Sequence, residues 1–321
     1  MNELSLVNED ALERFYNLFF RNRLAHAYLF VGADGCGKME TALAVAKMVN
    51  CQGKISKNSP YCDICSSCLQ ANNKSHPDIC LIDTAEDTIK IEQVKDFIRD
   101  FRLKSFMGKI KVCIIRSAEK LTLEASNSLL KTLEEPTDNT LIILTSVSNE
   151  KMLSTIVSRC HQMNFPLLST RKLNATLTEM FKMKAEEAQY LSMVSEGSLG
   201  KAKDLKEKNY FEEKNYYIDE FILSFDYDKA LKVILSDKIK TRELLNVLHS
   251  WVRDAMLLRS SVEDSRLVNI DRIAELKRFI GNASLAEINE LYAQVIKTIG
   301  LYNENLNIKV PLMMIKELID R

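Results

Sequence analysis

The sequence has few of the residues that interrupt regular structure, with only 5 Pro and 9 Gly among 321 residues. It has no apolar run approaching the roughly 18 to 20 residues needed to cross a bilayer, and its beginning lacks the basic segment and apolar core of a secretory signal. Net charge is zero, because Lys plus Arg and Asp plus Glu number 44 each. These absences predict a helix-rich cytoplasmic protein with no membrane partner, and they argue against strong nucleic-acid binding by the isolated chain.

A phosphate-binding loop is present, but it lacks part of its metal-handling chemistry. An apolar strand expected over 27–31 leads into Gly32, and the loop continues through Gly35 and Gly37 to Lys38. Glycines let backbone N–H groups approach phosphates, and the following helix N-terminus favours negative charge. Met39 stands where a Ser or Thr hydroxyl would hold Mg²⁺, and a thioether is a poor magnesium ligand. The loop either holds ATP or ADP without hydrolysing it or is a structural relic that binds no nucleotide.

The second metal ligand expected of such a site is also missing. The strand expected over 110–115 runs into Arg116 and Ser117, where an acid and a water-polarising Glu would be expected. A positive charge about 4 Å from Mg²⁺ would be repelled by at most about 8 kcal/mol at an effective dielectric constant near 20. Glu40, Thr41 and Glu119 are the neighbours that could replace the missing ligands. Because phosphoryl transfer depends on the metal, we predict no intrinsic ATPase activity.

Cysteine is concentrated in one short segment, which is otherwise rich in Ser and Asn. Four thiolates offer the soft, tetrahedral ligand set of a structural zinc site, and a polar insert over about 50–73 would need the metal to become ordered. His76 or Cys80 could replace the first of the four, and surface thiols or a redox pair are the alternative interpretation. The remaining cysteines are expected to be small buried side chains or exposed thiols. The predicted zinc ligands are Cys51, Cys62, Cys65 and Cys68.

Strands alternate with helices up to Pro166, which predicts a parallel sheet with right-handed crossovers. Strand patterns then disappear, leaving a small helical unit with a turn at 197–200 and a longer helical region. We therefore predict an α/β domain over 1–166, a helical lid domain over 167–208 and an all-α C-terminal domain over 209–321. The expected strands are 27–31, 78–82, 110–115, 140–145 and 162–165, and the expected helices are 11–21, 39–49, 91–101, 121–133, 149–156, 219–235, 242–258, 270–280 and 285–302.

Several runs of this sequence together resemble the bacterial clamp-loader AAA+ subunits of DNA polymerase III. They are the phosphate-loop approach over 23–32, the four-cysteine insert, Ser75 to Asp78, Leu129 to Pro136, and Ser158 to Cys160. The likeness is specific over 22–166 and weaker but consistent over the helical remainder. It implies an AAA+ P-loop domain with a zinc-binding insert, a helical lid, and C-terminal helices that form a collar with those of partner subunits.

The family contains the ATP-hydrolysing γ/τ subunits and the non-hydrolysing δ′ subunit, and the departures at Met39, Arg116 and Ser117 are similar to the latter. In such proteins the arginine of the Ser-Arg-Cys motif reaches the ATP of the neighbouring subunit, a role that would fall to Arg159. Without the resemblance, an arginine in this position would be read as solvated or paired to a carboxylate. A sensor arginine is absent from the Gly-Ser turn, where Lys201 follows Gly200.

The resemblance also implies partners and a place in replication. The chain would join γ/τ and δ subunits in a heteropentamer that opens a ring-shaped sliding clamp and places it on primer-template DNA, within the DNA polymerase III holoenzyme, a nucleotidyltransferase. Two other functions stay open. One is an ATP-hydrolysing γ/τ-type motor subunit that tolerates unusual motifs, and the other is a zinc-containing module that binds DNA independently.

Overall fold

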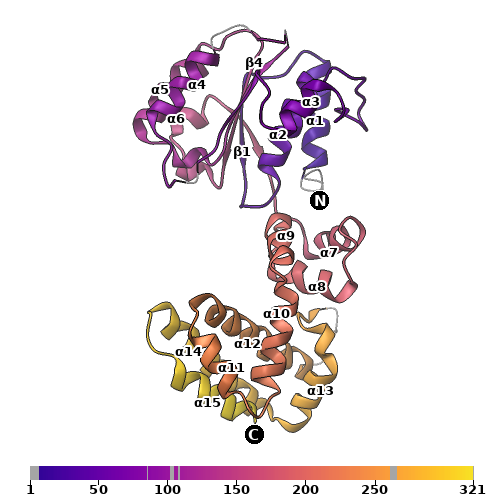
Figure 1. Cartoon of the computed structure of the whole chain (residues 1–321), viewed down its shortest axis with the longest axis vertical. Coiled ribbons are helices and arrows are strands. Elements are labelled where there is room, and N and C mark those ends of the chain that lie inside the picture. Colours follow the sequence, from indigo (N-terminus) through magenta and orange to yellow (C-terminus); the bar gives the residue numbers. More distant parts are fainter. Residues whose placement is uncertain (1–6, 85, 102–104, 108, 261–265, 321) are drawn as a thin grey trace. The chain divides into compact units, whose positions relative to one another are not determined.

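The computed structural model describes residues 7–84, 86–101, 105–107, 109–260 and 266–320 (Figure 1). The chain divides into two compact units, Met1–Ser169 with Gly197–Lys201, and Thr170–Glu196 with Ala202–Arg321. None of the described helices combines the length and the apolar character that a membrane crossing requires.

The first unit is built on a five-stranded parallel sheet, as predicted, with strand order β2-β3-β4-β1-β5. Since β1 lies between β4 and β5, the loop that follows it starts inside the sheet rather than at its edge. Each strand lies within one residue of its predicted bounds. The strands are β1 (Ala27–Val31), β2 (Ile79–Ile82), β3 (Lys111–Ile115), β4 (Thr140–Ser146) and β5 (His161–Asn164).

Helices pack on both faces of the sheet and form a core on each. Side chains along a strand point alternately to the two faces, so one strand can contribute to both cores. On β1, Tyr28 and Phe30 enter one core, and Ala27 and Leu29 enter the other. Figure 1 shows α1, α2 and α3 over the first face and α4, α5 and α6 over the second. Their bounds are α1 (Glu9–Phe20), α2 (Lys38–Asn50), α3 (Ser66–Asn72), α4 (Ile91–Phe101), α5 (Leu123–Glu134) and α6 (Ser154–Val157).

The second unit contains helices only in its described part, around a core that includes the fully buried Trp251. Its helices are α7 (Thr170–Glu179), α8 (Ala185–Val194), α10 (Tyr210–Tyr217), α11 (Asp228–Leu235), α12 (Lys238–Arg259), α13 (Ile273–Asn282), α14 (Leu285–Asn303) and α15 (Lys309–Ile319), with short turns η4 (Ile218–Ile222) and η6 (Ile270–Arg272). Helix α9 (Leu199–Glu207) begins within the segment that belongs to the first unit.

The single helix predicted over 219–235 is wrong. Its first part is the π-helical turn η4, which continues α10, and a break precedes α11. In the break, the backbone N–H of Asp226 donates to the Ser224 hydroxyl at 3.2 Å. Such local side-chain bonds compete with the helical ladder, and an apolar repeat does not reveal them. Helices α10 and α15 were not predicted.

One ion pair is buried inside the second unit. The Lys214 ammonium is fully buried and lies 2.6 Å from both carboxylate oxygens of Asp271. It also lies over the rings of Phe211 and Tyr190, at 4.5 and 4.9 Å from their centroids. Burial lowers the pKa of Lys214, and the Asp271 carboxylate opposes that shift. This cation therefore joins α8, α10 and η6.

Candidate functional sites

The phosphate loop connects the end of β1 to the first residue of α2, Lys38. The Lys38 side chain is turned onto its own loop, where its ammonium donates to the carbonyl oxygens of Gly32 at 2.5 Å and Ala33 at 2.7 Å. Only 8% of this residue is exposed. The cation that would contact phosphate is thus already paired with loop carbonyls, so a nucleotide would have to compete with two internal hydrogen bonds.

Thr41 does not supply the hydroxyl that the loop lacks. Its Oγ1 donates to the Gly37 carbonyl at 2.7 Å and accepts from the Asn8 backbone N–H at 2.9 Å, and the residue is fully buried. The sequence alternative in which Thr41 binds Mg²⁺ would break both bonds and leave the partly buried Asn8 amide without this partner, which costs free energy.

The Gly-Ser turn that precedes α9 lies directly against the phosphate loop. The Gly200 backbone N–H donates to the Gly35 carbonyl at 2.9 Å, and the Ser198 hydroxyl donates to the Asp34 carbonyl at the same distance. A Cβ atom on Gly200 would lie 2.6 Å from the Gly35 Cα. Sequence reasoning identified this turn only as the place of a missing arginine, and nothing in the sequence indicated that two glycines meet here.

Gly200→Ala is therefore expected to destabilise the chain although alanine is the better helix former. The steric conflict with Gly35 should cost about 1–3 kcal/mol in the free energy of unfolding. Gly300→Ala is the matched control, because a Cβ on this α14 glycine would meet nothing within 4 Å. That variant should gain up to about 1 kcal/mol. Denaturant unfolding of both variants measures the difference, and equal stability would contradict the close contact.

At the end of β3, Arg116 turns toward the neighbouring strand end. Its Nη1 lies 3.1 Å from Oδ2 of Asp83, which follows β2. The next residue, Ser117, has a left-handed backbone with φ of 53°, and its N–H donates to the Thr145 hydroxyl at 3.0 Å. The position of the expected metal-binding acid is thus held by an exposed ion pair, and the acid nearby in the chain is Glu119 in the following turn (Ala118–Lys120).

The structure brings the four predicted zinc ligands together. One ligand atom from each of Cys51, Cys62, Cys65 and Cys68 lies within 4.8 Å of all the others. Zn–S bonds of about 2.3 Å in a tetrahedron place sulfurs about 3.8 Å apart, so a small contraction would close the site. The arrangement fits a metal ion such as zinc, which would hold the insert to the end of α2.

Backbone donors favour the thiolate form that a metal requires at Cys62 and Cys65, whereas burial raises the pKa of Cys51 and Cys68. The N–H groups of Cys65 and Cys68 each donate to the preceding cluster sulfur, at 3.4 Å to Cys62 and Cys65 respectively. Donors at Ile64 and Cys65 lower the pKa of Cys62. Burial alone would raise the pKa of Cys65, but hydrogen bonds from neighbouring backbone and thiol groups bring it to about 6.

The two substitutes considered for Cys51 are engaged elsewhere. His76 accepts from the Asp78 N–H through Nδ1 at 3.0 Å, and its Nε2 lies 3.0 Å from the Ser67 hydroxyl. Cys80 lies on β2, in register with the buried Cys113 of β3. Among the described residues, the cluster therefore consists of the four cysteines alone.

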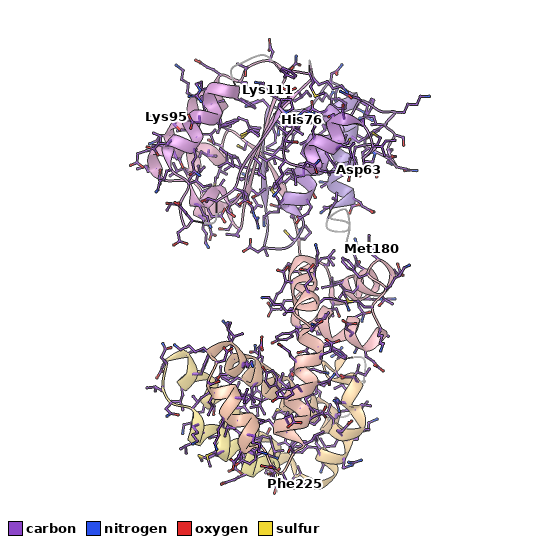
Figure 2. All side chains as sticks on the ribbon, viewed as in Figure 1. Asp63, His76, Lys95, Lys111, Met180 and Phe225 are labelled. Atoms are coloured by element: carbon purple, nitrogen blue, oxygen red, sulfur yellow. The ribbon has the colours of Figure 1, made fainter. Side chains whose placement is uncertain are left out.

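The insert was expected to be ordered only by metal, but the structure also gives it a helix and anchors on α2. Cys65 is the N-cap of α3, where its sulfur accepts from the Cys68 N–H. The Lys47 ammonium lies 2.6 Å from the Asp63 carboxylate and 4.2 Å from the centre of the Tyr61 ring. Figure 2 shows Asp63 and His76 on the α2–α3 side of the sheet and Lys95 on the opposite side.

The predicted trans-acting arginine follows α6, close to the end of α5. Nη1 of Arg159 donates to the Thr155 carbonyl at 2.9 Å, and Nη2 pairs with Oε1 of Glu134. The side chain keeps 34% of its surface exposed. Burial raises the pKa of the adjacent Cys160 thiol to about 12, which disfavours its thiolate. The arginine is thus paired to a carboxylate, as expected without the family resemblance, and it is also partly exposed to solvent.

The fold and the loop define a P-loop α/β protein whose phosphate loop lacks its usual metal ligands. Residues 7–169 match the family described as DNA polymerase III, delta subunit, and residues 209–320 match its C-terminal counterpart. The chain belongs to this family of DNA polymerase III clamp-loader subunits.

Individual relatives carry more than one subunit name. The chain is 32% identical over 177 residues to DNA polymerase III subunit delta′ of Bacillus subtilis, which covers 55% of the chain and 53% of the relative. It is 35% identical over 149 residues to the delta′ subunit of Pseudomonas aeruginosa, covering 46% and 45%. A gamma subunit of Buchnera aphidicola is 27% identical over 277 residues, covering 85% and 72%. The matched stretch thus spans about half the length of the two delta′ relatives.

Proposed function

We propose that this chain is the δ′-type subunit of a clamp loader, a non-hydrolysing subunit that presents Arg159 to ATP held by a neighbouring subunit. The observation that carries the proposal is the contrast between two sites of the first unit. The phosphate loop offers Met39 and an internally paired Lys38, and Arg116 replaces the metal-binding acid. Arg159, in comparison, is held at the surface with part of its side chain exposed.

In this proposal the chain acts without turnover of its own. It joins γ/τ- and δ-type subunits in a pentamer that opens a sliding clamp and places it on primed DNA within the DNA polymerase III holoenzyme. The α/β domain over 1–166 carries the zinc-stiffened insert, the lid domain covers 167–208, and the helices over 209–321 form the collar. The phosphate loop binds ATP or ADP weakly or not at all, because its lysine is paired with loop carbonyls.

A γ/τ-type motor is the second candidate, favoured by the gamma relative that matches 85% of the chain. The two candidates differ in turnover by the isolated chain. We expect no ATP hydrolysis above background from the purified chain with Mg²⁺ and primed DNA, and no change on Lys38→Ala. Turnover that Lys38→Ala abolishes would instead identify a motor subunit.

Assembly completes the test. Tagged γ/τ- and δ-type subunits from the same cell should retain the chain on co-purification, and adding the chain should raise their DNA-stimulated ATPase rate. A chain that neither co-purifies with these subunits nor changes their rate would overturn the proposed role.

A further inference from the structure

Glu134 is the last residue of α5 and lies in the Leu129–Pro136 run, to which no role has been given. The backbone of Glu134 is held in place by the packing of α5. Leu129 and Leu133 of this helix are buried in the sheet-facing core, and the Thr122 side chain caps the helix start. At the other end, Nε2 of His26 donates to the Leu133 carbonyl at 3.0 Å. The carboxylate of Glu134 thus extends from a rigid support.

The Arg159 guanidinium lies between the C-terminal ends of two helices. Its contact to Glu134 is at the end of α5, where the helix dipole favours a cation, and its contact to Thr155 is to a carbonyl of α6. Two of its five N–H groups make these bonds, and among the described residues no partner is seen for the other three, which can meet an acceptor outside the chain. Glu134 itself is half exposed, so the pair is accessible rather than enclosed in the core.

We infer that Glu134 is a positioning residue for Arg159. A free arginine would lose rotamer freedom when it contacts the phosphates of a neighbour, and a planar fork already held by Glu134 and Thr155 has lost part of that freedom beforehand. The carboxylate and the carbonyl fix the plane of the guanidinium, and the remaining N–H groups are left to meet phosphate oxygens. This inference rests on the proposed function of Arg159.

The test uses the reconstituted clamp-loader complex and its DNA-stimulated ATPase. Glu134→Gln keeps the size of the side chain but removes its charge, and kcat should fall about fivefold, the upper end of what an exposed ion pair supplies. KM for ATP should change little, because the arginine acts mainly on charge that develops in the transition state. Glu135→Gln is the matched control, since Glu135 is the next residue and makes no ion pair among the described residues. It should retain the wild-type rate.

A double-mutant cycle separates positioning from simple loss of structure. In the Arg159→Ala background, Glu134→Gln should have no further effect on kcat. An equal fall in both backgrounds, or a wild-type rate for Glu134→Gln while Arg159→Ala is impaired, would overturn the positioning role alone. An unimpaired Arg159→Ala complex would overturn the proposed function as well, so the two failures are distinguishable. Thermal unfolding of each variant confirms that the compared chains are folded.

Discussion

Replacing Arg159 with alanine is expected to lower ATP hydrolysis at the adjoining subunit of a reconstituted clamp loader by about 10³- to 10⁵-fold, the contribution measured for arginine fingers in other phosphoryl-transfer enzymes. The physical reason is that the N–H groups of the guanidinium left without a partner in the described part of the chain can meet phosphate oxygens, where negative charge is concentrated during the reaction. Single-turnover hydrolysis by the complex, measured with primed DNA and sliding clamp, reports this site directly.

Two further variants make the result specific. Arg159→Lys keeps the charge but loses the planar fork, so it should recover only part of the rate. Arg171→Ala removes another exposed arginine of the chain and should leave the rate unchanged. Wild-type hydrolysis by the Arg159→Ala complex, with assembly intact, would show that this residue does not act on the neighbour.

Removing a ligand of the four-cysteine cluster should abolish metal binding and lower the stability of the chain. Cys68 is fully buried at the four-cysteine cluster, and Cys68→Ser should reduce the zinc content of the purified chain from about one ion per chain to almost none. Structural zinc in small peptides binds with about 10–16 kcal/mol at neutral pH. Since α3 and the Lys47 contacts supply part of the order here, we expect a loss of several kcal/mol in stability rather than global unfolding. Elemental analysis and thermal unfolding measure both.

Cys160→Ser is the control for the metal prediction, because its thiol lies outside the cluster. This variant should keep its zinc and nearly all of its stability. A Cys68→Ser chain that retains zinc, or a chelator-treated wild type with unchanged thermal unfolding, would contradict a structural metal at this position.

The features that could be predicted from sequence are those set by local periodicity. Short apolar runs alternating with helical patterns predicted the strands and the parallel sheet, and the Gly-rich loop after β1 followed from residue types alone. The spacing of the cysteines predicted the zinc ligands, and the structure places their sulfurs within 4.8 Å of one another. What could not be predicted depends on contacts between distant segments. From sequence Thr41 is available for metal, but in the fold its hydroxyl accepts from the Asn8 backbone N–H, which lies 33 residues earlier.

Contacts between distant segments also decide the pairing of Arg159, and a local side-chain bond decides where α11 begins. Its partner Glu134 lies 25 residues earlier in the sequence, and only the fold brings the ends of α5 and α6 together. The break between η4 and α11 depends on a hydroxyl–amide bond at Ser224, which an apolar repeat does not encode. The division into three domains and the role of the arginine stay predictions.

The buried Lys214–Asp271 pair has a consequence for local opening of the second unit. Separating α8 and α10 from η6 would leave an uncompensated ammonium or carboxylate in an apolar core, and breaking such a pair costs about 3–5 kcal/mol. Local separation of α8 and α10 from η6 is therefore disfavoured. Amides of α8 and α10 should then exchange with solvent as one cooperative group.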